Sequence, residues 1–360
     1  MIPMADMDGA SLRRAREEAG LSLAGMARRA GYSRSHLGNV ETGAKRVTTD
    51  VVLAYERVLG DVLDRRGVLT GLAAGLIGPG AASELIRHGF TSALDGRGSP
   101  DDWERQVAGY GHDYMVLGAS ELQAKLAGDL VVLQQHVESP HLWGLAARAM
   151  TVYGKTTKEP AEAISWYALA GKAADRSGDE SVQVWTRGRA ALALAYEGAA
   201  LNVASQLAEH ALQLSDKPSL GRLNALLGQA HVQGLRGQRK EAQSSLDTAR
   251  RVFDQCGSEE QISDFAIPEW RMATISSLLL SRVGAEAQAV KAQETADTTR
   301  PATLPRFATH IELHRGLMLA RTGDRTGGAT YARAALAKLP AEKHSQSLRL
   351  MLTEIERTGS

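Results

Sequence analysis

The chain has 360 residues, of which 43% are hydrophobic, 23% charged and only 5% aromatic. This composition excludes a disordered or fibrous protein, and the length suits two domains, or one small domain followed by a repeat array. Because aromatic residues are few, apolar contacts must come mainly from Ala and Leu, which are strong helix formers. The formal net charge of +1 neither favours nor excludes a nucleic-acid partner. We therefore expect an all-α protein.

The first 62 residues are predicted to form a compact bundle of short helices that end at glycines. The expected helices run from Ser11 to Ala19, from a Ser22 cap to Ala30, from a Ser33 cap to Thr42, and from a Thr48 or Thr49 cap to Leu59, with Gly20, Gly31, Gly43 and Gly60 as stops. Apolar residues at helical spacing are expected to form one core, made of Leu12, Ala15, Leu23, Met26, Ala27, Leu37, Val40, Val52 and Leu59.

Residues 63–100 are predicted to connect this bundle to a second domain. Arg65 and Arg66 precede an apolar, Gly-rich run from Val68 to Ala82, which superficially looks like a twin-arginine export signal or a membrane helix. The run is internal and too short to span a bilayer comfortably, so an interdomain helix or linker is favoured. Residues 96–102 (GRGSPDD) are expected to form a surface loop, with a helical region starting at Trp103.

Residues 101–360 are predicted to contain a helical repeat. Pairs of small residues seven positions apart lie in successive expected helices, and the first members of the pairs are 41, 38, 47 and 39 residues apart. The pairs are Ala163 and Ala170, Ala204 and Ala211, Ala242 and Ala249, Ala289 and Ala296, and Gly328 and Ala335. This layout resembles a degenerate tetratricopeptide repeat, in which small residues let two antiparallel helices pack closely. We expect a solenoid of α-helical hairpins, with an irregular helical bundle as the alternative.

The stretch from Leu21 to Val47, LSLAGMARRAGYSRSHLGNVETGAKRV, closely resembles the helix-turn-helix of phage-repressor-like (XRE) regulators. Residues 11–46 also hold eight cations against three carboxylates. The resemblance implies that the third helix enters the DNA major groove and that Arg34, Ser35 and Asn39 read base edges, since Arg grips guanine and Asn grips adenine. His36, in the same helix, is a further candidate for a DNA contact.

Other residues of this motif are expected to hold phosphates or to stabilise the domain. Lys45 and Arg46 follow the recognition helix, and Ser22 and Ser33 stand at helix starts; these four are the phosphate-contact candidates. Family members commonly have a glutamine where this chain has Leu23, so one DNA contact is expected to be lost or shifted. Arg16 and Glu41 occupy positions where the family often places an internal ion pair, which implies a structural role.

Cysteine usage, the N-terminal residues and the absent motifs indicate a cytoplasmic protein that is not an enzyme. Cys256 is the single cysteine, which excludes an intramolecular disulfide, and MIPMADMDGA lacks the features of a secretory signal. The chain contains no GxSxG, no phosphate-binding GxxxxGK[ST] and no HExxH, and its ten histidines form no metal-ligand pattern. We expect no cofactor, no metal and no membrane partner.

The leading hypothesis is a DNA-binding transcriptional regulator that acts as a homodimer on double-stranded DNA. The architecture resembles peptide-pheromone-responsive and actinobacterial XRE regulators, which implies that the repeats bind a signal peptide or small molecule. On that resemblance, Asn202, Asn224 and Arg271 are candidate ligand-binding residues. The alternative is a DNA-localised scaffold whose repeats bind a partner protein. A response-regulator phosphatase or inhibitor is a third reading, and the base-reading residues weigh against it.

Overall fold

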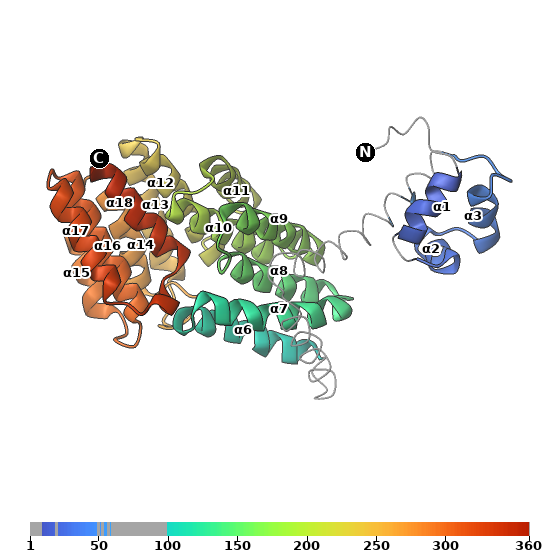
Figure 1. Cartoon of the computed structure of the whole chain (residues 1–360), viewed down its shortest axis with the longest axis horizontal. Helices are drawn as coiled ribbons and strands as arrows, with labels where there is room; N and C mark the ends of the chain where they lie inside the picture. The colour runs from blue at the N-terminus through green and yellow to red at the C-terminus, as the bar shows by residue number, and fades with distance from the viewer. Residues whose placement is uncertain are drawn as a thin grey trace. The chain divides into compact units, whose positions relative to one another are not determined.

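The computed structural model describes residues 9–18, 21–48, 51, 54, 55, 58 and 99–359, and all regular structure in these residues is helical (Figure 1). The chain divides into two compact units, Met1–Glu84 and Leu85–Ser360. The all-α prediction is therefore confirmed. The predicted connector lies almost entirely outside the described residues, so its limits stay a prediction. Within the described part, no helix is long and apolar enough to cross a membrane.

The first unit begins with three short helices, α1 (Gly9–Glu18), α2 (Leu23–Ala30) and α3 (Arg34–Glu41). Ser22 caps α2 by accepting a hydrogen bond from the Gly25 amide, and Ser33 caps α3 by accepting one from the His36 amide. Gly31, at φ +75°, ends α2 in the left-handed conformation that glycine adopts without steric cost. The two predicted helices with serine caps are thus present, and α3 ends one residue earlier than predicted.

The core of this unit contains the predicted residues of the three helices and an additional set from residues 51–58. Leu12, Met26, Ala27, Leu37 and Val40 are buried, and Leu23 packs half-buried against them. Their further neighbours are Val51, Ala54, Tyr55 and Val58, at the i, i+3, i+4, i+7 spacing of one helix face. The predicted core residues Val52 and Leu59, and the side chain of Ala15, lie outside the described residues.

The second unit is a succession of helices. In chain order these are α6 (Pro100–Val116), α7 (Ala119–His136), α8 (Pro140–Gly154), α9 (Pro160–Ser177), α10 (Glu180–Glu197), α11 (Leu201–Leu214), α12 (Leu220–Leu235), α13 (Arg239–Cys256), α14 (Glu269–Arg282), α15 (Glu286–Thr299), α16 (Pro305–Arg321), α17 (Arg325–Ala337), the 3-10 helix η2 (Ala341–Lys343) and α18 (Gln346–Gly359). The prediction of a loop up to residue 102 is wrong for its last residues. Ser99 caps α6 and Pro100 occupies the first turn of this helix, so the helix starts before Trp103.

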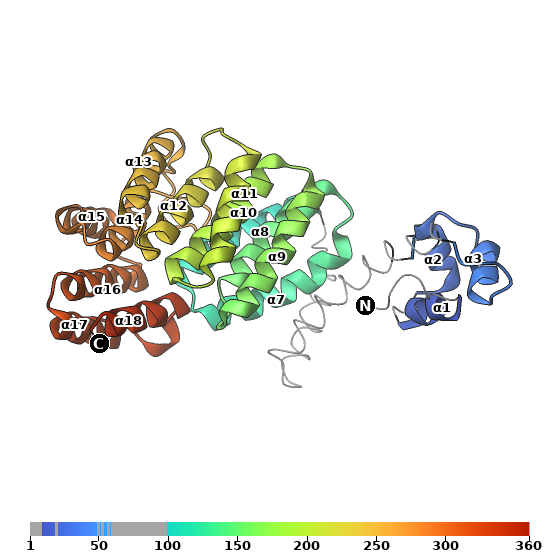
Figure 2. The same cartoon turned by 90° about the horizontal axis from the view of Figure 1, so that it is seen from above.

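Consecutive helices pair as hairpins, and the hairpins stack (Figures 1 and 2). α8 pairs with α9, α10 with α11, α12 with α13, α14 with α15, and α16 with α17, while the first helices of neighbouring hairpins also contact one another. Every predicted pair of small residues is buried in the second helix of its hairpin, from Ala163 and Ala170 in α9 to Gly328 and Ala335 in α17. The hairpin solenoid is therefore confirmed, and the small residues set its close helix spacing.

In the hairpin of α16 and α17, backbone meets backbone. A Cβ added to Gly316 would lie 2.9 Å from the carbonyl oxygen of Gly328, and one added to Gly328 would lie 2.5 Å from that of Gly316. A side chain at either position would force the helices apart. Gly316 stands twelve residues before Gly328, the first small residue of its unit.

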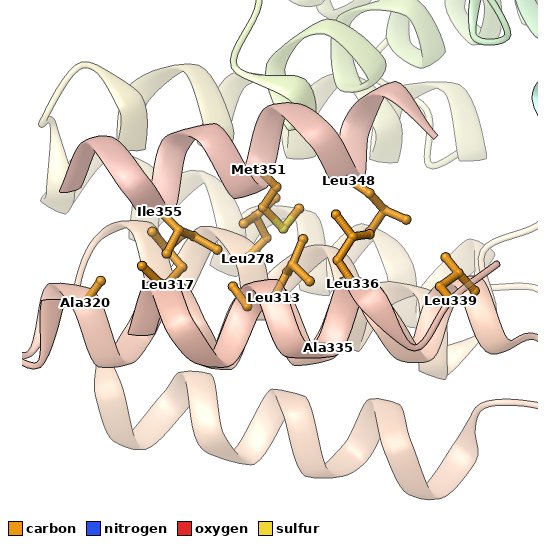
Figure 3. Close-up of a cluster of buried hydrophobic side chains, with 12 residues drawn as sticks. Leu278, Leu313, Leu317, Ala320, Ala335, Leu336, Leu339, Leu348, Met351 and Ile355 are labelled. Carbon is orange, nitrogen blue, oxygen red and sulfur yellow. The ribbon is translucent and has the colours of Figure 1, made fainter. Parts of the chain in front are cut away.

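The last helix covers the end of the solenoid. Leu348, Met351 and Ile355 of α18 are fully buried against α16 and α17, whose contributions include Leu313 and Leu317 (Figure 3). Arg282 of α14 adds a charged anchor, because its Nη2 lies 2.8 Å from Glu354 Oε2 on α18. The apolar face of the final hairpin is thereby removed from water, as terminal caps do in repeat proteins.

Candidate nucleic-acid interface and ligand cavity

Helix α3 has one buried and one exposed face. Leu37 and Val40 have no exposed surface and fix the helix to the core, whereas Arg34, Ser35 and Asn39 are exposed. A helix held by apolar residues on one side and carrying Arg and Asn on the other has the donor and acceptor types needed at base edges. The three main predicted base-contacting residues therefore share the outer side of one rigid helix.

His36 differs from these three residues. Its ring stacks on Tyr32, with the ring centroids 5.2 Å apart and the planes at 15°, and the side chain is half-buried. Its backbone amide donates to Ser33 Oγ. The ring is thus engaged with the turn between α2 and α3, so a DNA contact by His36 would have to use the exposed edge of a ring that is already stacked.

The predicted phosphate-contacting residues are all exposed. The hydroxyl oxygens of Ser22 and Ser33 accept backbone amide hydrogen bonds of 3.0 and 3.1 Å, which leaves each hydroxyl proton free to be donated. Lys45 and Arg46 lie in the segment after α3, and this segment is held to the helix by a 2.8 Å hydrogen bond from the Lys45 amide to the Asn39 carbonyl oxygen. Two cationic residues therefore lie in a segment whose backbone is held to α3.

A buried ion pair joins the start and the end of the helix-turn-helix region. Arg16 Nε lies 2.7 Å from Glu41 Oε1 and Arg16 Nη2 lies 2.8 Å from Glu41 Oε2, which is the bidentate geometry. Arg16 Nη1 also donates to the Leu21 carbonyl oxygen at 2.7 Å, and the hydrogen bonds to Glu41 raise the pKa of Arg16. The pair for which the sequence implied a structural role is thus present in the structure.

Tyr55 completes this network and was missed by the sequence analysis. Its hydroxyl donates to Glu41 Oε1 at 2.6 Å, and burial together with that carboxylate raises the pKa of Tyr55 well above its usual value. The spacing of Val51, Ala54 and Tyr55 could have placed Tyr55 on the buried face. Nothing in the sequence pattern showed that its hydroxyl would reach a carboxylate in another helix.

The second unit contains a cavity on the side formed by the first helices of the hairpins. We call it the ligand cavity; it encloses about 630 Å³ of empty space, part of it open to solvent. Its lining comes from α6, the end of α8, α10, α14, α16 and α18. One part of the lining is aromatic and aliphatic, including Trp270 and Phe307 in an edge-to-face contact, and the other part is charged.

The charged part of the ligand cavity is built around the buried carboxylate of Asp264. Lys155 Nζ lies 2.5 Å from Asp264 Oδ1, Arg189 Nη2 lies 2.8 Å from it and Arg271 Nη2 lies 3.1 Å from it. Burial alone would raise the pKa of Asp264, but the three cations hold it well below its usual range. Burial, with Arg189 nearby, lowers the pKa of Lys155 well below its ordinary value.

Asp264 belongs to the segment that makes one repeat spacing unusually long. The 47-residue interval in the repeat pattern arises because residues 257–268, between α13 and α14, form an irregular loop. The Asp264 amide donates to the Gly111 carbonyl oxygen of α6 at 2.8 Å, and Arg271 Nη1 donates to the Ser263 carbonyl oxygen at 2.7 Å. The loop therefore joins α14 to α6, far away in the sequence, and places a buried carboxylate against three side chains of the lining.

The predicted ligand-binding residues are placed in three different environments. Arg271 lines the ligand cavity. Asn202 is exposed on α11, a second helix of a hairpin, where its Oδ1 accepts a hydrogen bond from Arg236 Nη2 at 2.9 Å. Asn224 is buried in α12 and donates to the Leu220 carbonyl oxygen at 2.7 Å. Asn202 and Asn224 do not line the ligand cavity, and their role in ligand binding stays a prediction.

Next to the ligand cavity lies a buried cluster of histidines. Tyr196 Oη is 3.3 Å from His310 Nδ1 and 3.1 Å from His314 Nε2, and Ser277 Oγ is 2.5 Å from His314 Nδ1. Burial, followed by the charge of Arg306, lowers the pKa of His310 to about 3. These imidazoles are neutral at neutral pH. Among the described residues, no group of His, Cys, Asp and Glu is arranged to hold a metal ion.

Comparisons with known proteins identify the N-terminal segment. Residues 9–66 match the family described as helix-turn-helix domain. No curated protein matches the chain. Among solved structures, Bacillus thuringiensis PlcR in complex with the peptide PapR7 and DNA aligns at 14% identity with a TM-score of 0.33, covering 70% of this chain and 95% of that chain. A likeness this weak carries no argument, whereas the family match covers α1 to α3 and the segment that follows.

Proposed function

We propose that this chain is a cytoplasmic, sequence-specific DNA-binding regulator of transcription, whose helical-repeat domain binds an effector and controls DNA binding. The observation that carries the proposal is α3, which exposes Arg34, Ser35 and Asn39 while its other face is buried and Glu41 is tied to Arg16. A base-reading helix must be held rigidly, and this one is. The match of residues 9–66 to the helix-turn-helix domain family supports the same function.

The regulator acts as a homodimer on double-stranded DNA in this proposal. A single helix-turn-helix makes few base contacts, and dimers place two such helices one turn of DNA apart. The effector is a peptide or small molecule, and the ligand cavity is its binding site in the second unit. No catalytic step is assigned to the chain.

The proposal is tested by selecting binding sites from random double-stranded DNA with the purified full-length chain and with the Arg34→Ala, Asn39→Ala double variant. Each lost bidentate contact costs about 1–3 kcal/mol, so the variant should lose at least about 30-fold in affinity for the selected site. Arg105→Ala, an exposed arginine of α6, is the control for removing one positive charge. A palindromic motif that the double variant fails to bind supports a dimeric sequence reader.

Two results would contradict the proposal. Selection without any enriched motif would favour a scaffold whose repeats bind a partner protein, since such a protein needs no base recognition. If the double variant and the Arg105→Ala control bind an enriched motif with equal affinity, α3 does not read bases. Light scattering of the protein–DNA complex, measured on the same sample, determines whether two chains bind one site.

A further inference from the structure

The ligand cavity has more positive than negative charge at its buried end. Lys155, Arg189 and Arg271 all lie within hydrogen-bond distance of one carboxylate oxygen, Asp264 Oδ1, and each of these side chains is at most 7% exposed. Buried charges are costly unless they are paired and hydrogen-bonded. Within the described residues, therefore, one carboxylate is in direct contact with three cations.

The donors of this cluster are not all used. Among the described residues, Arg189 Nε has no hydrogen-bond partner although it is buried. Arg189 and Lys155 both line the ligand cavity, and Lys155 Nζ lies 3.4 Å above the ring of Tyr114, which also lines it. A buried guanidinium N–H without an acceptor is destabilising. Because Arg189 lines the cavity, an acceptor that enters it and reaches Nε would remove this destabilisation; Asp264 Oδ2 is likewise buried without a partner among the described residues.

Glu197 is the acidic residue of the cavity lining, and it does not cancel the positive charge fully. Burial raises its pKa to about 7, while Lys155 and Arg189 lower it only in part. At neutral pH, Glu197 is therefore protonated in a large fraction of molecules. A second cavity shares Tyr114 and Lys155 with the first, and it adds further cations at Lys158, Arg306 and Arg349 against the single acidic residue Glu342.

Another part of the lining is apolar, and it limits the chemical group to which a bound anion can be attached. Leu192 and Ile275 face the same space as Trp270 and Phe307, whose ring centroids lie 5.2 Å apart at 76°. Such a wall binds an aromatic or aliphatic group and excludes a strongly hydrated inorganic anion. The polar and apolar parts adjoin within one space, so one molecule can satisfy both.

We infer that the ligand cavity binds a carboxylate attached to a small aromatic or aliphatic group, with Arg189 and Lys155 contacting the carboxylate and the Trp270 side of the cavity covering the apolar group. An aromatic or fatty acid and the C-terminal residue of a peptide share this chemistry. The inference rests on the proposed function only for its consequence, the control of DNA binding. Binding itself follows from the cavity and stands or falls separately.

Binding is measured by calorimetry on the full-length chain without DNA, using matched probes. The small acids are 4-phenylbutyrate, indole-3-acetate and hexanoate, and their neutral counterparts are the corresponding amides. The peptide arm compares acetyl-Gly-Leu-Phe with a free carboxylate and the same peptide amidated. We expect at least one carboxylate to bind at least 10-fold more tightly than its amide, and the arm in which this occurs identifies the source of the ligand.

Two variants connect that preference to the cavity. Arg189→Gln removes the charge and the unpaired Nε and should lower carboxylate affinity at least 10-fold, while Arg105→Gln, on the exposed surface of α6, should leave it unchanged. Because Arg189→Gln could weaken folding, Ala193→Phe is used as well: it fills the cavity and keeps every charge. Circular dichroism and a melting curve show whether each variant is folded.

The outcomes separate the cavity from the regulator. Carboxylate binding that is lost in both cavity variants, while the variants remain folded, supports the inference. If adding the ligand does not change the affinity for DNA, the inference still stands, and only control of DNA binding by the effector is removed from the proposed function. Absence of carboxylate binding up to millimolar concentration, equal binding of acids and amides, or binding unaffected by Ala193→Phe would overturn the inference, while the selection of a DNA motif would be untouched.

Discussion

Replacing Glu41 by Gln should destabilise the helix-turn-helix region, although the substitution changes none of the predicted DNA-contacting residues. Glu41 accepts two short hydrogen bonds from Arg16 and one from Tyr55, and it is 6% exposed. Removal of one partner of a buried ion pair strands the other charge and costs about 3–5 kcal/mol. A unit of this size has a stability of only about 3–5 kcal/mol, so the variant should be largely or partly unfolded at 25 °C.

Hydrogen–deuterium exchange of peptides from residues 21–48 measures the loss of stability in this region alone. A circular dichroism signal would not show it, because the second unit contributes most of the helix. A loss of 3–5 kcal/mol corresponds to faster exchange by about two to four orders of magnitude, limited by full unfolding. Glu17→Gln is the matched control, because Glu17 contacts Arg13 at 2.9 Å on the exposed surface. Exchange in Glu41→Gln as slow as in Glu17→Gln would refute a stabilising role for the buried pair.

Three further predictions concern DNA affinity, pH and helix packing. The Lys45→Ala, Arg46→Ala variant should keep the sequence preference but reduce the slope of log affinity against log salt by about 4, because two cations are lost from each chain of the homodimer, and an unchanged slope would place both residues away from phosphates. His310, whose pKa is lowered to about 3, makes the second unit less stable as pH falls below about 6.5, by up to about 1.4 kcal/mol per pH unit. Urea unfolding at pH 7 and 5 should show this loss in the wild type and less of it in His310→Gln. Gly316→Ala should lower the melting temperature, because its Cβ would lie 2.9 Å from a carbonyl oxygen of the facing helix, whereas Gly109→Ala, with nothing within 4 Å, should not.

The order of the helices and many of their ends could be predicted because they depend on local chemistry. Ser22 and Ser33 accept amides three residues ahead, and Gly31 adopts a left-handed conformation, whatever the rest of the chain does. The pairs of small residues in the repeat could be predicted for the same reason. Alanines seven positions apart lie on one face of a helix, where a neighbouring helix can pack closely. The structure confirms these features element by element.

The ligand cavity could not be predicted because its residues come from distant parts of the chain. Lys155, Arg189 and Arg271 are 34 and 82 residues apart in sequence order and meet only at Asp264. The 47-residue interval is visible in the sequence, but no local pattern shows that its extra residues pack against α6. Nor could the sequence show that Arg271 lines the cavity and Asn202 does not, since residue type alone does not distinguish the two helices of a hairpin.

The sequence by itself determined that this protein is helical, that its first unit is a helix-turn-helix with Arg34 and Asn39 in the third helix, and that its second unit repeats. Those features depend on propensity, capping and periodicity, which act over a few residues. Only the tertiary structure decided that Tyr55 joins Arg16 and Glu41, and that the loop of residues 257–268 brings Asp264 to three cations. Such contacts depend on how the helices stack. Burial and the distance between charged groups determine how strongly the groups interact, and local residue spacing shows neither.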